Sequence, residues 1–299
     1  MARVLILGAT GMLGHKLCQM LPRLGHEASA TARGSASALK PYREAFKQVR
    51  LIGGIDALDE RKLERTISRA APDVLINCVG IIKQHPAAKD PLLSIGVNSC
   101  LPHRLARLCG GLGVRLIHIS TDCVFSGRKG NYTEEDVSDA EDLYGRSKFL
   151  GEVSGRGCLT LRTSIIGREL GGASGLLEWF LGNRGRTAPG YTRAVYTGFT
   201  TLEMARLIDR VIVRHPDLEG VWQVSSEPIS KYDLLCLVRD AMRLDIDVTA
   251  EAAVRIDRSL NSEKFRNKTG YQPPSWPAMI EELARDAAPY EEWRKAHAS

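Results

Sequence analysis

The feature that most constrains the fold is a short apolar run followed at once by three regularly spaced glycines. Residues 4–7 have the composition of a buried parallel strand, and apolar residues recur with helical spacing over residues 12–24. Between them stand Gly8, Gly11 and Gly14. Glycines at such a turn let backbone N–H groups approach a diphosphate, which the positive end of the helix dipole also attracts. The stretch therefore predicts a strand–turn–helix unit that binds a diphosphate; a glycine-rich turn that binds nothing is the alternative.

The charge and the cysteines narrow the class of protein. The net charge of +6, from 41 Lys and Arg against 35 Asp and Glu, is mild and contains no basic run. It argues against nucleic-acid binding and suits an anionic small molecule. The 7 cysteines are odd in number and lack Cys-x-x-Cys spacing, which argues against a disulfide framework and against a zinc site. No apolar stretch approaches the ~18 residues of a membrane span. We expect a cytoplasmic protein with no metal, no nucleic-acid partner and no membrane partner.

Strand and helix patterns alternate along the first half of the chain. The expected strands are residues 4–7, 28–32, 48–51, 74–78, 114–119 and 159–163, and the expected helices are residues 12–24, 59–70, 92–109 and 142–153. Strands separated by helices imply right-handed crossovers and a parallel sheet covered on both faces. The chain is therefore expected to form a Rossmann-type, doubly wound α/β fold with its ligand at the carboxyl ends of the strands.

The pattern changes after residue 163. The next segment is rich in Gly and Arg, and three further elements are expected: helices over 176–181 and 202–213 and a strand over 221–224. From residue 225 onward the sequence predicts irregular and helical structure. We expect residues 1–163 to form a nucleotide-binding domain, to which 201–224 returns. Residues 164–299 are expected to form a smaller C-terminal lobe that binds substrate.

Three side chains carry the chemistry. Thr121 follows the strand expected at 114–119, and Tyr144 and Lys148 stand at the start of the helix expected at 142–153. Positions four apart share one helix face, so the phenol and the ammonium group can point to the same place. Tyr-x-x-x-Lys alone arises often by chance, as a solvated lysine beside a tyrosine. Its position after the glycine turn and Thr121 favours a catalytic role.

With these motifs the chain resembles the extended short-chain dehydrogenase/reductase superfamily. It is most similar to dTDP-4-dehydrorhamnose reductases and related nucleotide-sugar reductases. The similar segments span most of the chain and are residues 8–14, 97–98, 120–125, 143–152, 161–164 and 258–262, with Trp276.

The resemblance implies reduction of the 4-keto group of a nucleotide-linked deoxysugar. Hydride moves from the reduced nicotinamide to the carbonyl carbon, Thr121 hydrogen-bonds the carbonyl oxygen, and Tyr144 donates the proton. Lys148 is implied to hold the nicotinamide ribose. A free tyrosine has a pKa near ~10, and we expect Lys148 and the oxidised nicotinamide to lower it toward neutral pH.

The coenzyme preference follows from the end of the second expected strand. Residues 31–34 contain Arg33 and no carboxylate that would hold a ribose 2′-hydroxyl. We therefore favour NADPH, with Arg33 on the 2′-phosphate; NADH with a surface Arg33 is the alternative. The other expected cofactor contacts, besides the three glycines, Tyr144 and Lys148, are Thr10, Met12, Leu13, Asp56, Ala57, Cys78, Val79, Gly80 and Asn98. Asp56 can equally begin a helix, and Asn98 can equally be a buried polar contact.

The substrate contacts are expected at Thr121, Asp122, Arg193 and Arg258, with an arginine on the diphosphate because its fork matches phosphate oxygens. Cys123 stands where the related sugar 4,6-dehydratases have a glutamate, which argues against dehydration. Residues 190–201 depart from the segment found in the rhamnose group, so the identity of the sugar stays open.

Two other functions use the same residues. One is a nucleotide-sugar epimerase with tightly bound NAD. The other is a non-catalytic regulatory subunit on the same fold, as in methionine adenosyltransferase. The oligomeric state is open, and a homodimer is one expectation.

Overall fold

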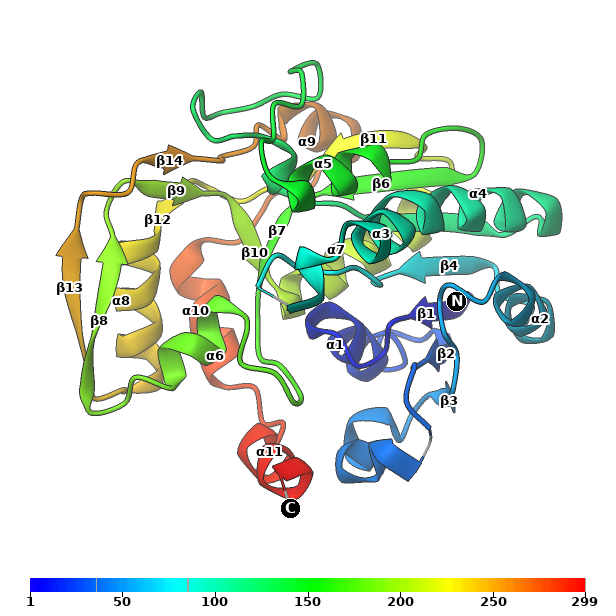
Figure 1. Cartoon of the computed structure of the whole chain (residues 1–299), viewed down its shortest axis with the longest axis horizontal. Coiled ribbons are helices and arrows are strands. Elements are labelled where there is room, and N and C mark those ends of the chain that lie inside the picture. The colour runs from blue at the N-terminus through cyan, green and yellow to red at the C-terminus, as the bar shows by residue number, and fades with distance from the viewer. Residues whose placement is uncertain (36, 85, 299) are drawn as a thin grey trace.

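A parallel sheet of seven strands organises the molecule (Figure 1). The computed structural model describes residues 1–35, 37–84 and 86–298. The strand order is β11-β6-β5-β4-β1-β2-β3, and every neighbouring pair is parallel. The strands are β1 (Arg3–Leu7), β2 (Glu27–Thr31), β3 (Arg50–Ile52), β4 (Val74–Asn77), β5 (Arg115–Ile119), β6 (Cys158–Arg162) and β11 (Gly220–Gln223). The expected Rossmann-type α/β fold is confirmed.

Helices cover both faces of the sheet because alternate residues of each strand point to opposite sides. Val4 and Ile6 of β1 belong to one core cluster, and Leu5 and Leu7 belong to another. The first cluster includes α1 (Met12–Met20) and α7 (Thr201–Arg214), and the second includes α2 (Glu60–Ala70) and α4 (Leu101–Leu112). Two further elements connect strands of the sheet: the 3₁₀ segment η1 (Ser37–Phe46) and helix α5 (Leu143–Leu150).

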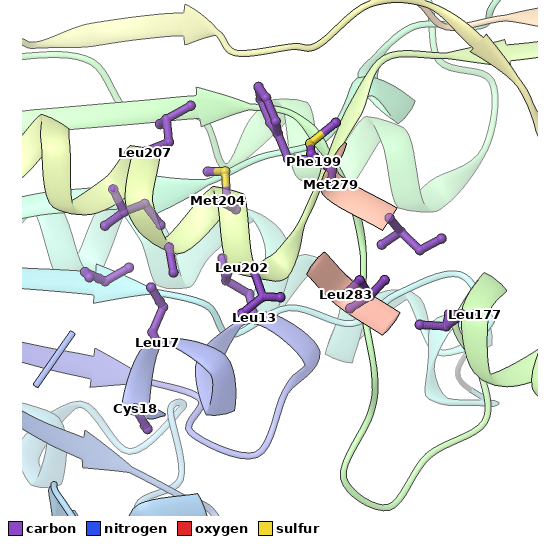
Figure 2. Packing of buried hydrophobic residues seen from close by; sticks show 14 of the residues in the cluster. Leu13, Leu17, Cys18, Leu177, Phe199, Leu202, Met204, Leu207, Met279 and Leu283 are labelled. Atoms are coloured by element: carbon purple, nitrogen blue, oxygen red, sulfur yellow. The ribbon is translucent and has the colours of Figure 1, made fainter. Parts of the chain in front are cut away.

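The C-terminal part of the chain packs on α1. Figure 2 shows Leu13 and Leu17 of α1 close to Leu202 of α7, with Leu283 of α10 (Trp276–Ala284) nearby. These side chains are buried in one cluster. Helix α1 therefore shares one hydrophobic core with the later helices α7 and α10.

Small sheets and helices form the rest of the molecule, to the left of the central sheet in Figure 1. They contain the pairs β7 (Ser164–Ile166) with β10 (Gly198–Thr200) and β8 (Arg186–Tyr191) with β13 (Ile246–Glu251), and the sheet of β12 (Ile229–Ser230), β9 (Ala194–Tyr196) and β14 (Ile256–Asp257). The helices here are α6 (Leu176–Leu181), α8 (Lys231–Met242), α9 (Glu263–Thr269) and α11 (Tyr290–Ala298).

The expectation of irregular and helical structure after residue 225 is wrong where β12, β13 and β14 form. These strands are two, six and two residues long. In β13 only Ile246 and Val248 are buried. Such short or largely exposed strands lack the run of alternating apolar residues that marks a strand in a sequence.

The helix expected over 92–109 is present, but it contains a π-helical turn that the sequence did not predict. The segment after the turn η2 (Pro86–Lys89) is divided into α3 (Pro91–Ser94), the π-helical η3 (Ile95–Cys100) and α4. Pro102 has no N–H, so the carbonyl of Asn98 lacks its α-helical donor. The N–H of Leu101 instead bonds the carbonyl of Gly96, five residues back. The wider turn places Asn98 inside η3.

Gly14 is required by the contact between α1 and the turn after β1. A Cβ at this position would lie 2.0 Å from the carbonyl oxygen of Gly8, which is backbone and cannot move aside. Gly8 has a φ of +88°, a left-handed value that suits glycine. The two glycines let the helix begin directly over the end of the strand.

We predict that Gly14→Ala lowers the free energy of unfolding by about 3 kcal/mol, since the added methyl group overpacks a rigid contact. Urea denaturation measures the change. Gly110→Ala is the control, because a Cβ at Gly110 meets no atom within 4 Å. That variant should be more stable by about 0.5–1 kcal/mol, as alanine is the better helix former. Equal midpoints for Gly14→Ala and the wild type would contradict the close contact.

Candidate active site

A cavity of about 630 Å³ lies at the carboxyl ends of the central strands. One wall comes from the segments after β1, β4 and β5 and from the first turns of α5, and the opposite wall comes from β9, β14 and the start of α8. The predicted site residues in its lining are Thr10, Gly11, Met12, Leu13, Cys78, Val79, Gly80, Thr121, Asp122, Tyr144, Lys148 and Arg258. Residues far apart in the sequence are thus brought to one place, as the switch point between β1 and β4 requires.

The glycine turn presents backbone donors to this cavity. Gly11 is the N-cap of α1 and makes no side-chain cap bond. The first N–H groups of a helix have no partner inside the helix, and the helix dipole adds positive charge there. Met12 and Leu13 line the cavity directly after the cap. The turn is built to receive an anionic group.

Thr121 and Tyr144 meet because α5 begins unusually close to the segment after β5. Asp142 caps α5 by accepting the N–H of Gly145 at 2.7 Å. A Cβ at Gly145 would lie 2.2 Å from the carbonyl oxygen of Cys123 in the 3₁₀ turn η4 (Asp122–Val124), so only glycine permits this approach. Thr121 and Tyr144 both line the cavity, and the Thr121 hydroxyl donates to Oδ1 of Asp122 at 3.1 Å and accepts the N–H of Cys123 at 3.1 Å.

Lys148 follows Tyr144 by four positions in α5 and is 4% exposed. Its Nζ donates to the carbonyl oxygen of Ile119 at 2.7 Å and lies 3.5 Å from Nε2 of His118. Burial lowers the pKa of Lys148 to about 8. The charge of this lysine therefore changes close to neutral pH.

The expected lowering of the Tyr144 pKa depends on a bound nicotinamide and stays a prediction. Burial is the largest influence and raises the pKa of Tyr144, with Cys123 raising it further, while the hydrogen bond of Thr121 opposes them. The Lys148 ammonium group is directed at the Ile119 carbonyl. The phenol consequently keeps its proton at neutral pH, the form that a proton donor needs.

Charged side chains gather on the other side of Thr121. Asp122 is buried, which raises its pKa, and the cations Arg258 and Lys231 oppose that rise. Arg258 donates to the carbonyl oxygen of Phe125 at 2.9 Å, and burial lowers the pKa of Lys231. Two cations thus face one carboxyl group at the end of the cavity nearest α8.

Sequence reasoning missed Lys231 and Tyr196, which both line the cavity. The Tyr196 hydroxyl is buried and has no hydrogen-bond partner among the described residues. No motif marks either residue, because only the folding of β9 and α8 against the sheet brings them to the site. Burial raises the pKa of the Cys123 thiol, which also lines the cavity, to about 12, so the thiol stays protonated at neutral pH.

Seven predicted site residues lie outside the lining, namely Gly8, Gly14, Arg33, Asp56, Ala57, Asn98 and Arg193. Gly8 and Gly14 shape the turn from behind it. Arg33 and Arg193 are exposed. The Asp56 carboxylate is exposed and accepts the N–H of Leu58 at 2.9 Å, a local turn contact.

Asn98 connects two walls of the cavity. Its side chain accepts the N–H of Ile81 at 2.8 Å and donates to the carbonyl of Ile81 at 3.0 Å and to the Ser147 hydroxyl at 3.2 Å. Ile81 itself lines the cavity. Asn98 therefore fixes the segment after β4 against α5 from a buried position.

A buried ion pair holds the base of the site. The Arg162 guanidinium donates to both oxygens of Glu152, at 2.8 and 2.7 Å, and the Ser120 hydroxyl donates to the same carboxylate at 2.7 Å. Both charged side chains are 6% exposed. Removing one partner of such a pair leaves a buried charge without compensation.

Neither a metal site nor a membrane-spanning helix is found among the described residues. In residues 1–35, 37–84 and 86–298, no three His, Cys, Asp or Glu side chains are grouped so that they could hold a metal ion. Within the same ranges, every helix is too short or too polar to cross a membrane.

The chain is similar in sequence to known proteins of two kinds. A dTDP-4-dehydrorhamnose reductase from Streptomyces griseus is 30% identical over 50% of this chain, a stretch that spans 43% of that relative. The methionine adenosyltransferase 2 subunit beta of Mus musculus is 25% identical over 95% of this chain and 90% of its own length.

Solved structures agree with the fold. A dTDP-4-dehydrorhamnose reductase from Bacillus anthracis in complex with NADP superposes with a TM-score of 0.77 at 19% identity, covering 94% of this chain and 98% of that one. A UDP-glucose-4-epimerase from Stenotrophomonas maltophila with bound NAD has a TM-score of 0.78 at 14% identity, covering 100% and 99%.

The fold and the family match define a member of the extended short-chain dehydrogenase/reductase superfamily. More narrowly, the chain belongs to the family described as "RmlD substrate binding domain", whose model matches residues 2–173. The resemblance to dTDP-4-dehydrorhamnose reductases and their relatives is confirmed.

Proposed function

We propose that this protein reduces the 4-keto group of a nucleotide-linked deoxysugar with NADPH. The observation that carries the proposal is the convergence of Thr121, Tyr144 and Lys148 in one cavity that also contains the glycine turn. The reductase from Streptomyces griseus supports the substrate class through its similarity to half of the chain.

The residues of this chain divide the work of the reaction. NADPH supplies the hydride when it is bound. The N–H groups at the start of α1 hold its diphosphate, and the Lys148 ammonium group holds the nicotinamide ribose. The Thr121 hydroxyl donates a hydrogen bond to the substrate carbonyl oxygen, where negative charge develops, and Tyr144 donates its proton to that oxygen.

The substrate side of the cavity is assigned to the later part of the chain. In this proposal residues 1–163, with 201–224, bind the cofactor, and residues 164–299 bind the nucleotide sugar. Arg258 and Lys231 provide two positive charges for the substrate diphosphate, since charge-assisted hydrogen bonds to phosphate are strong. Asp122 accepts hydrogen bonds from sugar hydroxyl groups. Arg193 remains a predicted substrate contact that must reach the cavity from its exposed position.

The preference for NADPH rests on Arg33. This arginine follows β2 and is exposed, and residues 31–34 contain no carboxylate that would repel a 2′-phosphate. The relative from Bacillus anthracis binds NADP, in agreement with this choice.

Two alternatives remain distinguishable by one assay. A regulatory role is supported by the mouse adenosyltransferase subunit, which aligns with nearly the whole chain. An epimerase is the other alternative, because it would use the same Thr, Tyr and Lys, and an epimerase structure shares the fold. The assay follows NADPH absorbance while nucleotide-linked 4-ketosugars are added. Stoichiometric NADPH oxidation supports the reductase. Interconversion of two sugars with retained NAD identifies an epimerase, and tight nucleotide binding without turnover identifies a regulatory subunit.

Tyr144→Phe should lower kcat by at least about 100-fold, because it removes the proton donor. The Kd for NADPH, measured by fluorescence titration, should stay within about two-fold of the wild type. Tyr191→Phe is the matched control, since Tyr191 in β8 lies outside the cavity lining. Wild-type turnover in Tyr144→Phe would remove the proposed mechanism.

The rate should also depend on the charge of Lys148. Its pKa is lowered to about 8, so the ammonium form is complete well below pH 8 and is lost as the pH rises through that value. We expect kcat/KM for NADPH, which reports the free enzyme, to fall above pH 8. Lys148→Arg keeps its charge and should not show this fall. An identical alkaline limb in both proteins would exclude Lys148 as its origin.

Arg33→Ala tests the coenzyme preference. The ratio of kcat/KM for NADPH to that for NADH should drop about 10-fold or more, as the variant loses a charged contact to the 2′-phosphate. Arg43→Ala removes an exposed arginine of η1 and serves as the control. If the ratio is the same in Arg33→Ala and the wild type, the assignment of Arg33 is refuted.

A further inference from the structure

The C-terminal helix α11 is connected to the glycine turn by two hydrogen bonds in series. The hydroxyl of Tyr290, the first residue of α11, lies 2.9 Å from Nε2 of His15. Nδ1 of His15 lies 2.9 Å from the carbonyl oxygen of Gly11. His15 is 0% and Tyr290 2% exposed, so water does not compete for either bond. We call Tyr290, His15 and Gly11 the relay.

The direction of both bonds follows from the chemistry of the groups. A carbonyl oxygen only accepts, so Nδ1 of His15 carries a proton. Burial lowers the pKa of His15 to about 4, which leaves the ring neutral with a single N–H. Nε2 therefore accepts, and the Tyr290 hydroxyl donates to it. The Asp286 carboxylate is a second acceptor for this hydroxyl, and the Lys16 ammonium group pairs with that carboxylate at 2.6 Å.

The relay acts on a peptide unit that faces the cavity. The Gly11 carbonyl accepts from Nδ1 of His15 and also from the His15 backbone N–H, at 3.1 Å. A trans peptide unit is planar, so holding this carbonyl turns the N–H of Met12 in the opposite direction. Met12 lines the cavity at the positive end of α1. The N–H of Met12 is thereby presented to the cavity.

Independent contacts hold the Tyr290 ring in place. The Arg168 guanidinium lies 4.7 Å from the centre of the ring and the Lys16 ammonium group 5.3 Å from it. Arg168 also pairs with Glu291 of α11 at 2.7 Å. Arg294 of α11 pairs with Glu178. The donor of the relay is therefore rigidly positioned against α1.

We propose that Tyr290 and His15 are positioning residues that orient the Gly11–Met12 peptide toward the diphosphate of the dinucleotide. In this view α11 belongs to the cofactor site although none of its described side chains lines the cavity. The inference rests on the proposed binding of a dinucleotide and on no other part of the proposed reaction.

Calorimetric titration of Tyr290→Phe with NADPH and with NADH tests the relay directly. Loss of one hydrogen bond should weaken dinucleotide binding about 5-fold, with kcat within about two-fold of the wild type. Tyr271→Phe is the matched control, because it removes another buried phenol hydrogen bond, to Glu203 at 2.7 Å, without touching the relay. It should lower Tm and leave the Kd unchanged.

A comparison of fragments separates orientation of the peptide from general loosening. 2′-Phospho-ADP-ribose contains the diphosphate and should lose as much affinity in Tyr290→Phe as NADPH does. 2′-AMP lacks the diphosphate and should bind the variant and the wild type equally. A wild-type Kd in Tyr290→Phe, or an equal loss for both fragments, would overturn the relay.

The same titrations distinguish this inference from the proposed reaction. If the wild type binds NADPH but reduces no ketosugar, the reaction falls and the relay is still judged by the Kd values. If the wild type binds neither dinucleotide, both proposals fall.

Discussion

The contact of α1 with the end of β1 sets the position of everything that follows in the site. An added Cβ at Gly14 would lie 2.0 Å from the carbonyl oxygen of Gly8, so the helix begins as near the strand as a backbone permits. This closeness places unpaired N–H groups at the carboxyl edge of the sheet. Since all seven strands are parallel, the segments after β4 and β5 emerge at the same edge. Because of this geometry, the glycine turn, Thr121 and Tyr144 line the same cavity.

Burial governs the electrostatics of the cavity. It lowers the pKa of Lys148 and raises those of Tyr144 and Asp122, so each group is moved toward its uncharged form. Opposite charges brought in by ligands restore the charged forms most effectively in such a low-dielectric site. The same burial strengthens any hydrogen bond that Thr121 and Tyr144 make inside the cavity. The side chains of this cavity are therefore more fully charged when an oppositely charged ligand is bound than when the cavity is empty.

The parallel strands and helices of residues 1–163 were predictable from the sequence. Apolar runs that end in glycine or in polar residues carry a strong signal for buried parallel strands, and Tyr144 with Lys148 has helical spacing. The π turn at Asn98 was missed because the apolar pattern continues through it; Pro102 was the available signal. Bounds elsewhere differ by a few residues, as for the helix expected over 142–153, which ends at Leu150.

The rest of the site depends on tertiary contacts that no local pattern encodes. The folding of β9 and α8 brings Tyr196 and Lys231 to the cavity. Helix α11 brings Tyr290 to His15, behind the glycine turn. The sequence suggested Arg33 from the end of the second expected strand and Arg193 from the fit of an arginine to a diphosphate, and the structure leaves both exposed. The rise that burial gives the Tyr144 pKa was also out of reach, because burial and the direction of the Lys148 ammonium group depend on the fold.

The outer strand β11 joins the sheet late, because it lies far along the chain from its neighbour β6. This strand closes the β6 edge of the sheet, yet the chain reaches it only after β7 to β10 and α7. Until then the backbone groups of β6 have no neighbour on that side, and such an edge is a template for pairing with other chains. Folding must therefore join distant segments before the sheet is protected, which slows it. A ribosome-bound chain that stops short of Gly220 would carry this exposed edge and should rely on chaperones to avoid aggregation.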